Sequence, residues 1–446
     1  MKTRGMRRVA ARYQWDRLEV SFWFAPVVMS VAAILLAWFM YYLDSLIPNE
    51  ILAESRIILT GTPGEMRTAL IGMATTILAT AGIVFTLLTL PLSTVAAQYG
   101  SRLLRVFLGD RTTQLVLGTF VATFVYCLAA ALTILPVQVE PEGPQLTVSV
   151  GLLLLLASFS SLILLVQHIS TMLQAPNIAA AAGAELREVV LAEIPEQVMR
   201  RDGDTNGPKM LPYSLVEKDA YPVLVTQSGS IQYIDPEYIL TLAQENDLII
   251  RLLRKPGQIV WQDTEIALVW PAERVDDELD RQIRNAFRIG TGRTPTQDVA
   301  YGVNQLVEMA VRAMSPAIND PFTAMTCLNY LGEGLALFIK QGEKSPSYYD
   351  QNNQLRLILE PITYAELLDG AFDMLRHASC DNARVLLHML EVIQTISLDV
   401  NSTKVNRELL HHINLIQEET TAGSMIDSDR ERISRRCMDL IGSLQT

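Results

Sequence analysis

Four long stretches without a charged residue limit what this chain can fold into. They cover residues 22–43, 68–97, 115–139 and 146–167. Each has the roughly 20 or more apolar positions that an α-helix needs to cross about 30 Å of hydrocarbon. Residues 22–43 are also too long for a removed signal peptide and lack a small-residue cleavage site. The pattern therefore predicts four transmembrane helices in a lipid bilayer.

The basic residues indicate how these helices are oriented. Six Lys and Arg residues precede the first stretch, and Arg102, Arg105 and Arg111 lie between the second and the third. Segment 44–67 is acid-leaning, and segment 137–146 carries only acidic charges. Basic segments stay on the cytoplasmic side of a membrane. We therefore expect a multi-pass protein of the bacterial inner (cytoplasmic) membrane, with both termini and everything after about residue 170 in the cytoplasm.

The predicted fold class combines a membrane α-helical domain with an α+β cytoplasmic domain. Runs rich in Val, Ile and Tyr, separated by turn residues, predict strands between residues 213 and 272. One short helix interrupts them, with Asp235 as its N-cap and Pro236 at its first position. Helical periodicity then predicts helices over 276–289, 297–314, 321–341, 364–377, 381–398, 402–420 and 427–443.

These elements divide the chain into five expected parts. They are a basic cytoplasmic N-terminus (1–21), a four-helix transmembrane domain (22–168), a linker helix and loop (169–212), a small β-rich subdomain (213–272) and a helical cytoplasmic domain (273–446).

The segment AMSPAINDPFTAM, residues 313–325, lies between two of the predicted helices. Pro316 disfavours a helical backbone at Ser315, so the preceding helix must stop there. Asp320 followed by Pro321 is an N-cap with proline at the first helical position, which predicts a restart. We therefore expect a helix stop, a short extended link and a helix restart. This interpretation explains the prolines and Asp320 but leaves Asn319 without a role.

The same segment gives the chain a family resemblance. RTPTQDVAYGVNQLVEMAVRAMSPAINDPFTAMTCLNYL, AQYGSRLLRVFLGDRTTQLVLGTFVATFVYCL, SGSIQYID and LRHASCDNARVLLHMLEVI resemble a bacterial family of predicted membrane proteins known only as a domain of unknown function. The resemblance extends over nearly the whole chain. The family tends to have Pro where this chain has Ser101. The resemblance implies the architecture and supplies almost no biochemistry.

The residues that enzymes and metal sites use form no convincing motif. Walker, GxSxG and GxGxxG motifs are absent, and the cysteines (Cys127, Cys327, Cys380 and Cys437) have no metal-ligand spacing. His377 with Asp373 and Asp381 has the residue types of a metal site, but a pair four residues apart is typical of an ordinary helix surface. We therefore expect no enzyme activity, no cofactor and no metal.

The other histidines are also expected to have no catalytic or metal-binding role. His168 is expected to extend toward the interface at the end of the fourth stretch, and His411 and His412 are expected to be solvated. A formal net charge of −12 argues against a nucleic-acid partner.

Small and hydroxyl-bearing residues follow the second stretch at spacings of three and four. At about 100° per residue they occupy one stripe of the helix. The stripe consists of Thr68, Gly72, Thr75, Ala79, Gly82, Thr86, Thr89 and Ser93. Small residues allow helices to pack closely in lipid, whereas hydroxyls also suit a water-filled path in an oligomer. Both interpretations stay open at this point. Pro91, which removes one backbone hydrogen bond, is a candidate kink.

Two classes of function follow from these patterns. The stretches contain no acidic or basic residue, which argues against a proton-coupled carrier and a voltage sensor. We expect a homo-oligomeric ion channel or channel-like transport protein, with small ions as its cargo and a cytoplasmic domain that assembles and gates it. The alternative is a non-transporting membrane scaffold or stress sensor that binds a protein partner. An enzyme ranks third.

Overall fold

The protein is described from a computed structural model. The described residues are 23–46, 59, 61–98, 110–134, 144–191, 219–343, 346–350, 352–398, 402–423 and 425–445. The chain divides into two compact units, Met1–Ile178 and Ala179–Thr446, here called unit 1 and unit 2. The expected N-terminal segment 1–21 and the loop that follows the linker helix lie outside the described residues.

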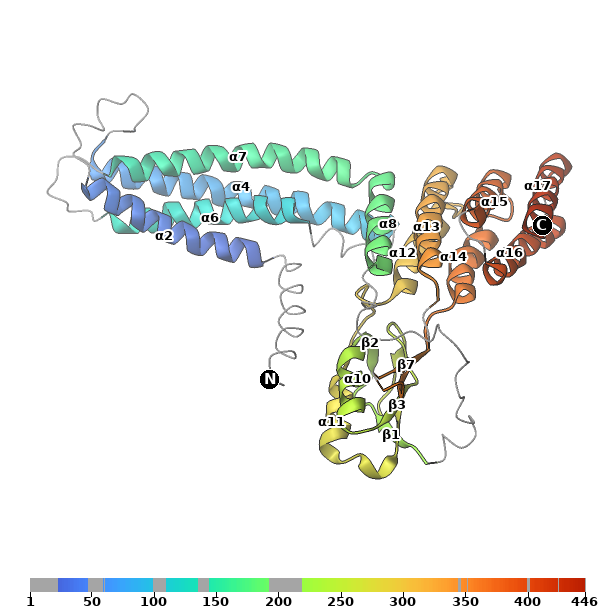
Figure 1. Cartoon of the computed structure of the whole chain (residues 1–446). Helices are drawn as coiled ribbons and strands as arrows, with labels where there is room; N and C mark the ends of the chain where they lie inside the picture. The colour runs from blue at the N-terminus through green and yellow to red at the C-terminus, as the bar shows by residue number, and fades with distance from the viewer. Residues whose placement is uncertain are drawn as a thin grey trace. The chain divides into compact units, whose positions relative to one another are not determined.

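Unit 1 is a bundle of four long helices that run side by side (Figure 1). They are α2 (Phe24–Leu46), α4 (Pro63–Gln98), α6 (Arg111–Thr133) and α7 (Gln145–Met172). Each overlaps one of the four charge-free stretches. Helices α6 and α7 each pack against the other three, and α6 makes the more extensive contacts. Helix α4 runs through Pro91 as one continuous helix.

Five described helices are long and apolar enough to cross a membrane, one more than the sequence analysis predicted. Four are those of unit 1, and the fifth is α13 (Pro321–Gln341) in unit 2. Within the most apolar window of α13, 56% of the residues are buried inside the structure, compared with 17–44% for the other four. The apolar side chains of α13 therefore largely pack within unit 2.

The first part of unit 2 contains two β-sheets. One has five strands in the order β1-β5-β3-β8-β7, and the other has three in the order β4-β2-β6. All pairs are antiparallel except β3 with β8. The strands are β1 (Tyr221–Leu224), β2 (Gly229–Ile234), β3 (Ile249–Leu252), β4 (Ile259–Val260), β5 (Glu265–Trp270), β6 (Phe287–Gly290), β7 (Ser347–Tyr349) and β8 (Leu355–Ile358).

The sheets extend beyond the residues predicted to be β-rich. Strands β6, β7 and β8 all lie after residue 272, within the part that was expected to be helical. The predicted helix 276–289 is wrong at its end, because α11 (Asp277–Asn285) stops and Phe287–Gly290 pairs with β2. Strands β7 and β8 are only three and four residues long, which is too short for a clear alternating pattern.

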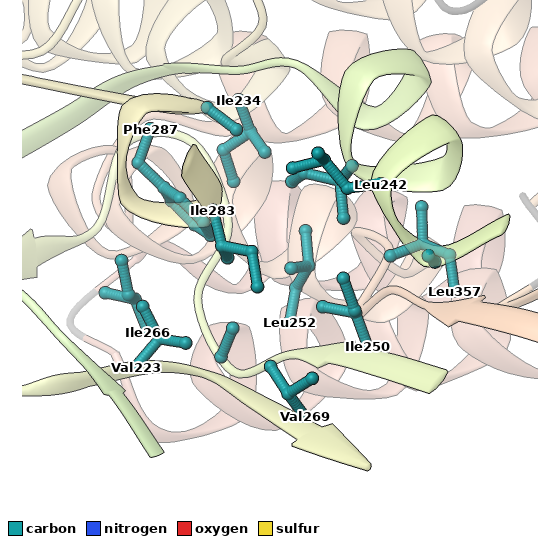
Figure 2. Packing of buried hydrophobic residues seen from close by; sticks show 14 of the residues in the cluster. Val223, Ile234, Leu242, Ile250, Leu252, Ile266, Val269, Ile283, Phe287 and Leu357 are labelled. Atoms are coloured by element: carbon teal, nitrogen blue, oxygen red, sulfur yellow. The ribbon is translucent and has the colours of Figure 1, made fainter. Parts of the chain in front are cut away.

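One hydrophobic core lies between these sheets and two helices, as Figure 2 shows. The helices are α10 (Pro236–Glu245) and α11, and the short 3₁₀ helix η3 (Ala272–Arg274) connects β5 to α11. The core includes Val223 of β1, Ile250 of β3 and Leu357 of β8. Helix α10 has the predicted N-cap, because the carboxylate of Asp235 accepts a hydrogen bond from the backbone N–H of Tyr238 at 3.0 Å.

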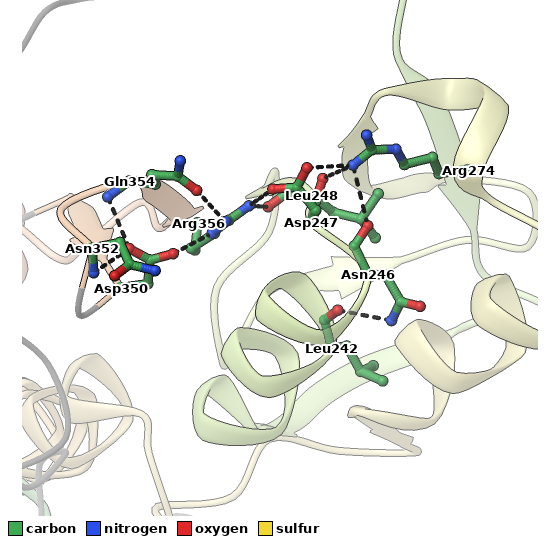
Figure 3. A network of polar contacts seen from close by, with 9 residues as sticks. All are labelled: Leu242, Asn246, Asp247, Leu248, Arg274, Asp350, Asn352, Gln354 and Arg356. Atoms are coloured by element: carbon green, nitrogen blue, oxygen red, sulfur yellow. Dashed lines mark hydrogen bonds and ion pairs between the residues drawn. The ribbon is translucent and has the colours of Figure 1, made fainter.

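A buried arginine connects the β7–β8 hairpin to the turn after α10 (Figure 3). The guanidinium of Arg356 donates to the carboxylate of Asp350 at 2.8 Å and to that of Asp247 at 2.7 Å. Arg274 donates to the same Asp247 at 2.6 Å. Two loops more than a hundred residues apart in sequence thus share one network of charged groups.

The rest of unit 2 is helical. Its helices are α12 (Val299–Ala313), α13, α14 (Tyr364–Ala378), α15 (Ala383–Leu398), α16 (Thr403–Ala422) and α17 (Asp427–Gln445). Helix α8 (Ala175–Leu191) contributes residues to both units. The predicted helices from residue 297 onward are confirmed to within a few residues at each end.

Candidate functional site

The stripe of small and hydroxyl-bearing residues lies on the outside of the unit 1 bundle. Thr68, Gly72, Thr75, Ala79, Gly82, Thr86, Thr89 and Ser93 are all exposed. The side chains that α4 buries against its neighbours are apolar and lie elsewhere on the helix: Met66, Leu70, Ala74, Ile77, Val84 and Leu88. The stripe therefore makes no close packing within its own bundle.

The stripe hydroxyls donate hydrogen bonds within α4. Thr68 donates to the carbonyl of Gly64 at 2.8 Å, and Thr75 donates to that of Ile71 at 2.9 Å. Thr86 donates to the carbonyl of Gly82 at 3.0 Å. A hydroxyl whose hydrogen is already bonded costs less to place in an apolar environment, and its oxygen can still accept from water. The stripe thus suits either an apolar or a wet surface.

The interior of the same bundle is filled. Two clusters of buried apolar side chains occupy it, one around Tyr126 and one around Phe120. Between α6 and α7 the hydroxyls of Thr123 and Ser158 bond to each other at 2.9 Å, and both residues are fully buried. The described residues therefore leave the exposed faces of a single bundle, rather than its centre, as surfaces for water or ions.

A carboxylate near one end of the bundle connects two helices. Asp44, in the last turn of α2, accepts hydrogen bonds from the backbone N–H groups of Leu146 and Thr147 at 2.8 and 2.9 Å. It also accepts from the hydroxyl of Thr147 at 2.6 Å. Tyr126 of α6 donates to the carbonyl of Thr147 at 2.9 Å. Asp44 thus caps the N-terminus of α7 from another helix. Sequence reasoning counted Asp44 only as a loop charge, because a cap donated across a hundred residues leaves no local pattern.

A second carboxylate occupies the start of α6. Asp110 is the N-cap, and it accepts from the backbone N–H of Thr113 at 2.7 Å. Its Oδ2 atom also lies 3.0 Å from Nε2 of His168 on α7. The ring of His168 therefore pairs with the cap of a neighbouring helix, a partner that the sequence analysis did not predict.

The segment 313–325 forms the predicted stop and restart. Helix α12 ends at Ala313, and α13 begins at Pro321 with Asp320 as its N-cap. The carboxylate of Asp320 accepts from the backbone N–H groups of Phe322 and Thr323, each at 3.1 Å. The backbone N–H of Asp320 donates to the carbonyl of Ala313 at 2.8 Å. One residue thus satisfies backbone groups at the end of one helix and the start of the next.

The link between the two helices is a turn, and the expectation of an extended link is wrong. The carbonyl of Ser315 accepts from the N–H groups of Ile318 and Asn319 at 3.1 and 2.8 Å. Asn319 has a φ of 49°, in the left-handed region that asparagine tolerates better than most residues. This conformation explains Asn319, which the sequence pattern did not. Pro316, Ile318 and Asn319 are exposed.

Among the histidines of unit 2, His411 is exposed as expected, whereas His412 is not. His377 does not join Asp373 and Asp381 in a group of metal-ligand size; its Nδ1 lies 2.7 Å from Glu419. His412 was expected to be solvated but is buried between helices. In the part of the chain that the structure describes, the group with ligand atoms close enough for a metal ion is Asp369, Asp373 and His412. The signal that could have found it is the spacing of four between the two aspartates.

The four cysteines are free thiols, as expected from their spacing. Burial raises the pKa of Cys327 to about 12 and that of Cys437 to about 11. These two thiols are therefore protonated at neutral pH, which makes them poor nucleophiles.

The chain is similar to one family of predicted membrane proteins and to uncharacterised mycobacterial proteins. Residues 19–395 match the family described as "Predicted membrane protein (DUF2254)". The uncharacterised proteins Mb1321c of Mycobacterium bovis and Rv1290c of Mycobacterium tuberculosis are each 28% identical over 351 residues, which is 77% of this chain. The chain spans 66% of the length of these curated relatives. No solved structure matches the chain.

Proposed function

We propose that this chain, which belongs to the DUF2254 family of predicted membrane proteins, is a homo-oligomeric ion channel or channel-like transport protein of the bacterial inner membrane. Helices α2, α4, α6 and α7 cross the bilayer, and both termini lie in the cytoplasm. Unit 2 is then a cytoplasmic domain that assembles and gates the membrane part. The proposal assigns no catalysis to the chain.

The membrane-spanning set excludes α13. More than half of the most apolar window of α13 is buried inside unit 2. A spanning helix at this place would have to abandon that packing, whereas α2, α4, α6 and α7 offer apolar faces that need lipid. The excess of Lys and Arg before α2 and between α4 and α6 supports the orientation.

The exposed position of the α4 stripe carries the channel proposal. A single bundle is filled with apolar side chains, so a conducting path would lie between copies of the chain. The stripe offers hydroxyl oxygens and small side chains along most of α4, on a face that its own bundle leaves open. Several such faces around a symmetry axis would line a path that water can wet.

The segment 313–325 fits the assembly role. Its capping bonds hold α12 and α13 at a fixed angle, and they leave Ile318 and Phe322 exposed at the tip. Arg384 lies 4.8 Å from the centre of the Phe322 ring. An exposed apolar tip on a rigid turn is suited to a contact with another subunit.

The hydrogen bonds of the stripe favour a second candidate, a membrane scaffold that binds a protein partner. Because the threonines already donate to their own helix, the stripe can pack against a neighbouring helix without water. In a scaffold, the stripe would join subunits by close contact of small residues.

Single-channel recording from purified full-length protein in a planar bilayer separates the two candidates. Thr75→Leu and Thr86→Leu add bulk to the stripe, whereas Thr86→Val removes only the hydroxyl and keeps the shape. For a channel we expect all three to change conductance or selectivity, and Thr86→Val to do so without changing the oligomer. Thr80→Leu is the matched control, since Thr80 lies about 120° around α4 from Thr86 at about 100° per residue.

A folded oligomer that stays silent across salts and voltages would contradict the channel proposal. If Thr86→Val then leaves the oligomer intact while Thr86→Leu dissociates it, the stripe is a packing surface and the scaffold takes first place.

A further inference from the structure

Two neighbouring helices of unit 2 bring a buried histidine and two carboxylates together. Asp369 and Asp373 are four residues apart on α14 and therefore lie on one face of that helix. His412 comes from α16, which packs against α14. The side chain of His412 is 1% exposed, whereas those of Asp369 and Asp373 are 50% and 46% exposed. The cluster thus has a buried end and a solvent-accessible end.

The ring of His412 is directed at the carboxylates without forming hydrogen bonds to them. Nε2 lies 3.2 Å from Oδ1 of Asp369, and Nδ1 lies 3.8 Å from Oδ1 of Asp373. Neither nitrogen has a hydrogen-bond partner among the described residues. A buried polar group without a partner costs free energy. A ligand that bonds to the ring of His412 would remove this cost.

The surroundings favour a neutral ring. Burial lowers the pKa of His412, and the nearby charges of Asp373 and Asp369 only partly oppose this effect. His411, whose ring centre is 5.6 Å away, and Arg376 also lower the pKa of His412. The edge of the ring faces the aromatic side chain of Phe372, with the ring centres 5.4 Å apart. A neutral imidazole in such a place has a nitrogen lone pair available for coordination.

The carboxylates around His412 carry more negative charge than the neighbouring positive groups balance. The guanidinium of Arg376 donates to Glu419 and also to Oδ1 of Asp373 at 3.4 Å, so its single positive charge is shared between two carboxylates. Glu419 is already occupied, since His377 contacts its other oxygen at 2.7 Å. Among the described residues, Asp369 has no ion-pair partner other than His412 itself. Two carboxylates beside a neutral imidazole therefore leave negative charge uncompensated.

We propose that Asp369, Asp373 and His412 bind a divalent transition-metal ion, of the Zn²⁺ and Mn²⁺ class. Their possible ligand atoms all lie within 4.8 Å of one another. One imidazole nitrogen with two carboxylate oxygens is a ligand set that such ions accept, and Ca²⁺ and Mg²⁺ are disfavoured because they prefer oxygen alone. Water would complete the coordination on the exposed side. The bound ion would join α14 to α16, and this inference does not depend on the channel proposal.

Metal binding can be measured on the full-length protein in detergent, without a histidine tag and after treatment with a chelator. Mn²⁺ is the probe, because its free form gives a strong electron paramagnetic resonance signal that decreases on binding. We expect one Mn²⁺ bound per chain and displacement by Zn²⁺. Asp369→Asn and Asp373→Asn should each weaken binding by about 10-fold or more, in line with the effect of disturbing a ligand shell. His411→Ala and Asp381→Asn are controls that should leave affinity unchanged.

A second readout identifies the nitrogen ligand. Pulsed electron paramagnetic resonance of bound Mn²⁺ should show coupling to nitrogen, and the coupling should be absent in His412→Gln. If His412→Gln does not fold, the two half-exposed aspartates still test the site. The proposal is overturned if Mn²⁺ and Zn²⁺ do not bind stoichiometrically, or if binding is unaffected by the substitutions at Asp369 and Asp373. In that case the cluster is an ion pair of the helix interface.

Discussion

Asn319 shows how one side chain can be required by the backbone alone. Its φ of 49° lies in the left-handed region, where a Cβ atom crowds the following carbonyl. Asparagine and glycine tolerate this conformation better than other residues. The residue is exposed, so its identity follows from the turn rather than from packing.

Replacing Asn319 tests this reason directly. Asn319→Ala should lower the free energy of unfolding by about 1 kcal/mol, because the left-handed conformation is less favourable for alanine. Asn319→Gly is the matched control and should be close to neutral. Chemical denaturation of the full-length protein in detergent gives the comparison. Equal effects of alanine and glycine would mean that the side chain, and not the backbone, matters here.

Asp44 acts through the three donors that it satisfies at the start of α7. Asp44→Ala should destabilise unit 1 by about 1–2 kcal/mol, the range for loss of an N-cap. Asp44→Asn keeps one acceptor oxygen and should lose less. Thermal unfolding of the purified protein measures both variants. If Asp44→Ala does not change the thermal stability, water replaces the cap at this end of the bundle.

At the scale of elements, a network of charged groups joins the β7–β8 hairpin to the turn before β3. Strand β8 pairs with β3 in parallel, and Arg356 of β8 bonds to Asp247 in the turn before β3. The backbone of Gln354 and that of Asn352 donate to Asp350 at 2.9 Å each. This network adds to the packing of Tyr348 and Leu357 in the hydrophobic core.

The network predicts how the hairpin responds to acid. Hydrogen bonds from Arg274 and Arg356 lower the pKa of Asp247. Burial of Asp350 opposes ionisation, but the bonds from Gln354, Arg356 and Asn352 outweigh it and lower its pKa as well. A lowered pKa in the folded state stabilises the fold above the ordinary Asp pKa of about 3.9. That stabilisation is lost as the pH falls through the lowered values.

Hydrogen exchange of the β8 amides, corrected for the intrinsic rate at each pH, measures this effect. Protection of Leu355–Ile358 should decrease as the pH falls below about 4. In Asp350→Asn the protection should be weaker at neutral pH and should change less with acid. The role of Asp350 is contradicted if acid lowers the hydrogen-exchange protection of β8 no more in the wild type than in Asp350→Asn.

At the scale of the whole molecule, two glycines of unit 1 allow the stability of the bundle and the assembly of copies to be tested separately. A Cβ atom at Gly82 would meet nothing within 4 Å, whereas one at Gly151 would lie 3.2 Å from Leu70 and 3.6 Å from Tyr126. Gly82 is on the exposed stripe of α4, and Gly151 faces the interior from α7. The two positions therefore report on different surfaces of the same bundle.

Gly82→Leu should leave the fold of the chain stable, and it should dissociate the proposed oligomer only if the stripe is a close-packed surface, as in the scaffold alternative. Gly151→Leu should destabilise the bundle itself by about 1–3 kcal/mol, as overpacking of a filled core does. Native mass spectrometry of the purified variants gives the oligomeric state, and thermal unfolding gives the stability. If Gly82→Leu assembles like the wild type, the stripe is not a close-packed surface between copies, which contradicts the scaffold alternative.

Much of the architecture could be predicted from the sequence, because the signals are periodic or local. Charge-free length identifies the helices of unit 1, and cap residues such as Asp235 and Asp320 mark helix starts. The helix spacing of the α4 stripe is also visible in the sequence. That all eight positions face outward is not, since it depends on which side of α4 packs against α6 and α7.

The tertiary structure decided what depends on distant partners. Strand β8 joins β3 across about a hundred residues, and Asp44 caps a helix at a similar distance. His412, read from its polar helix as solvated, is buried because α14 lies against it. A short segment fixes its own backbone preferences, but which of its faces is buried is set by the packing of the whole chain. For this reason the sequence alone determined the elements, while the contacts between them, and with them the candidate sites, required the fold.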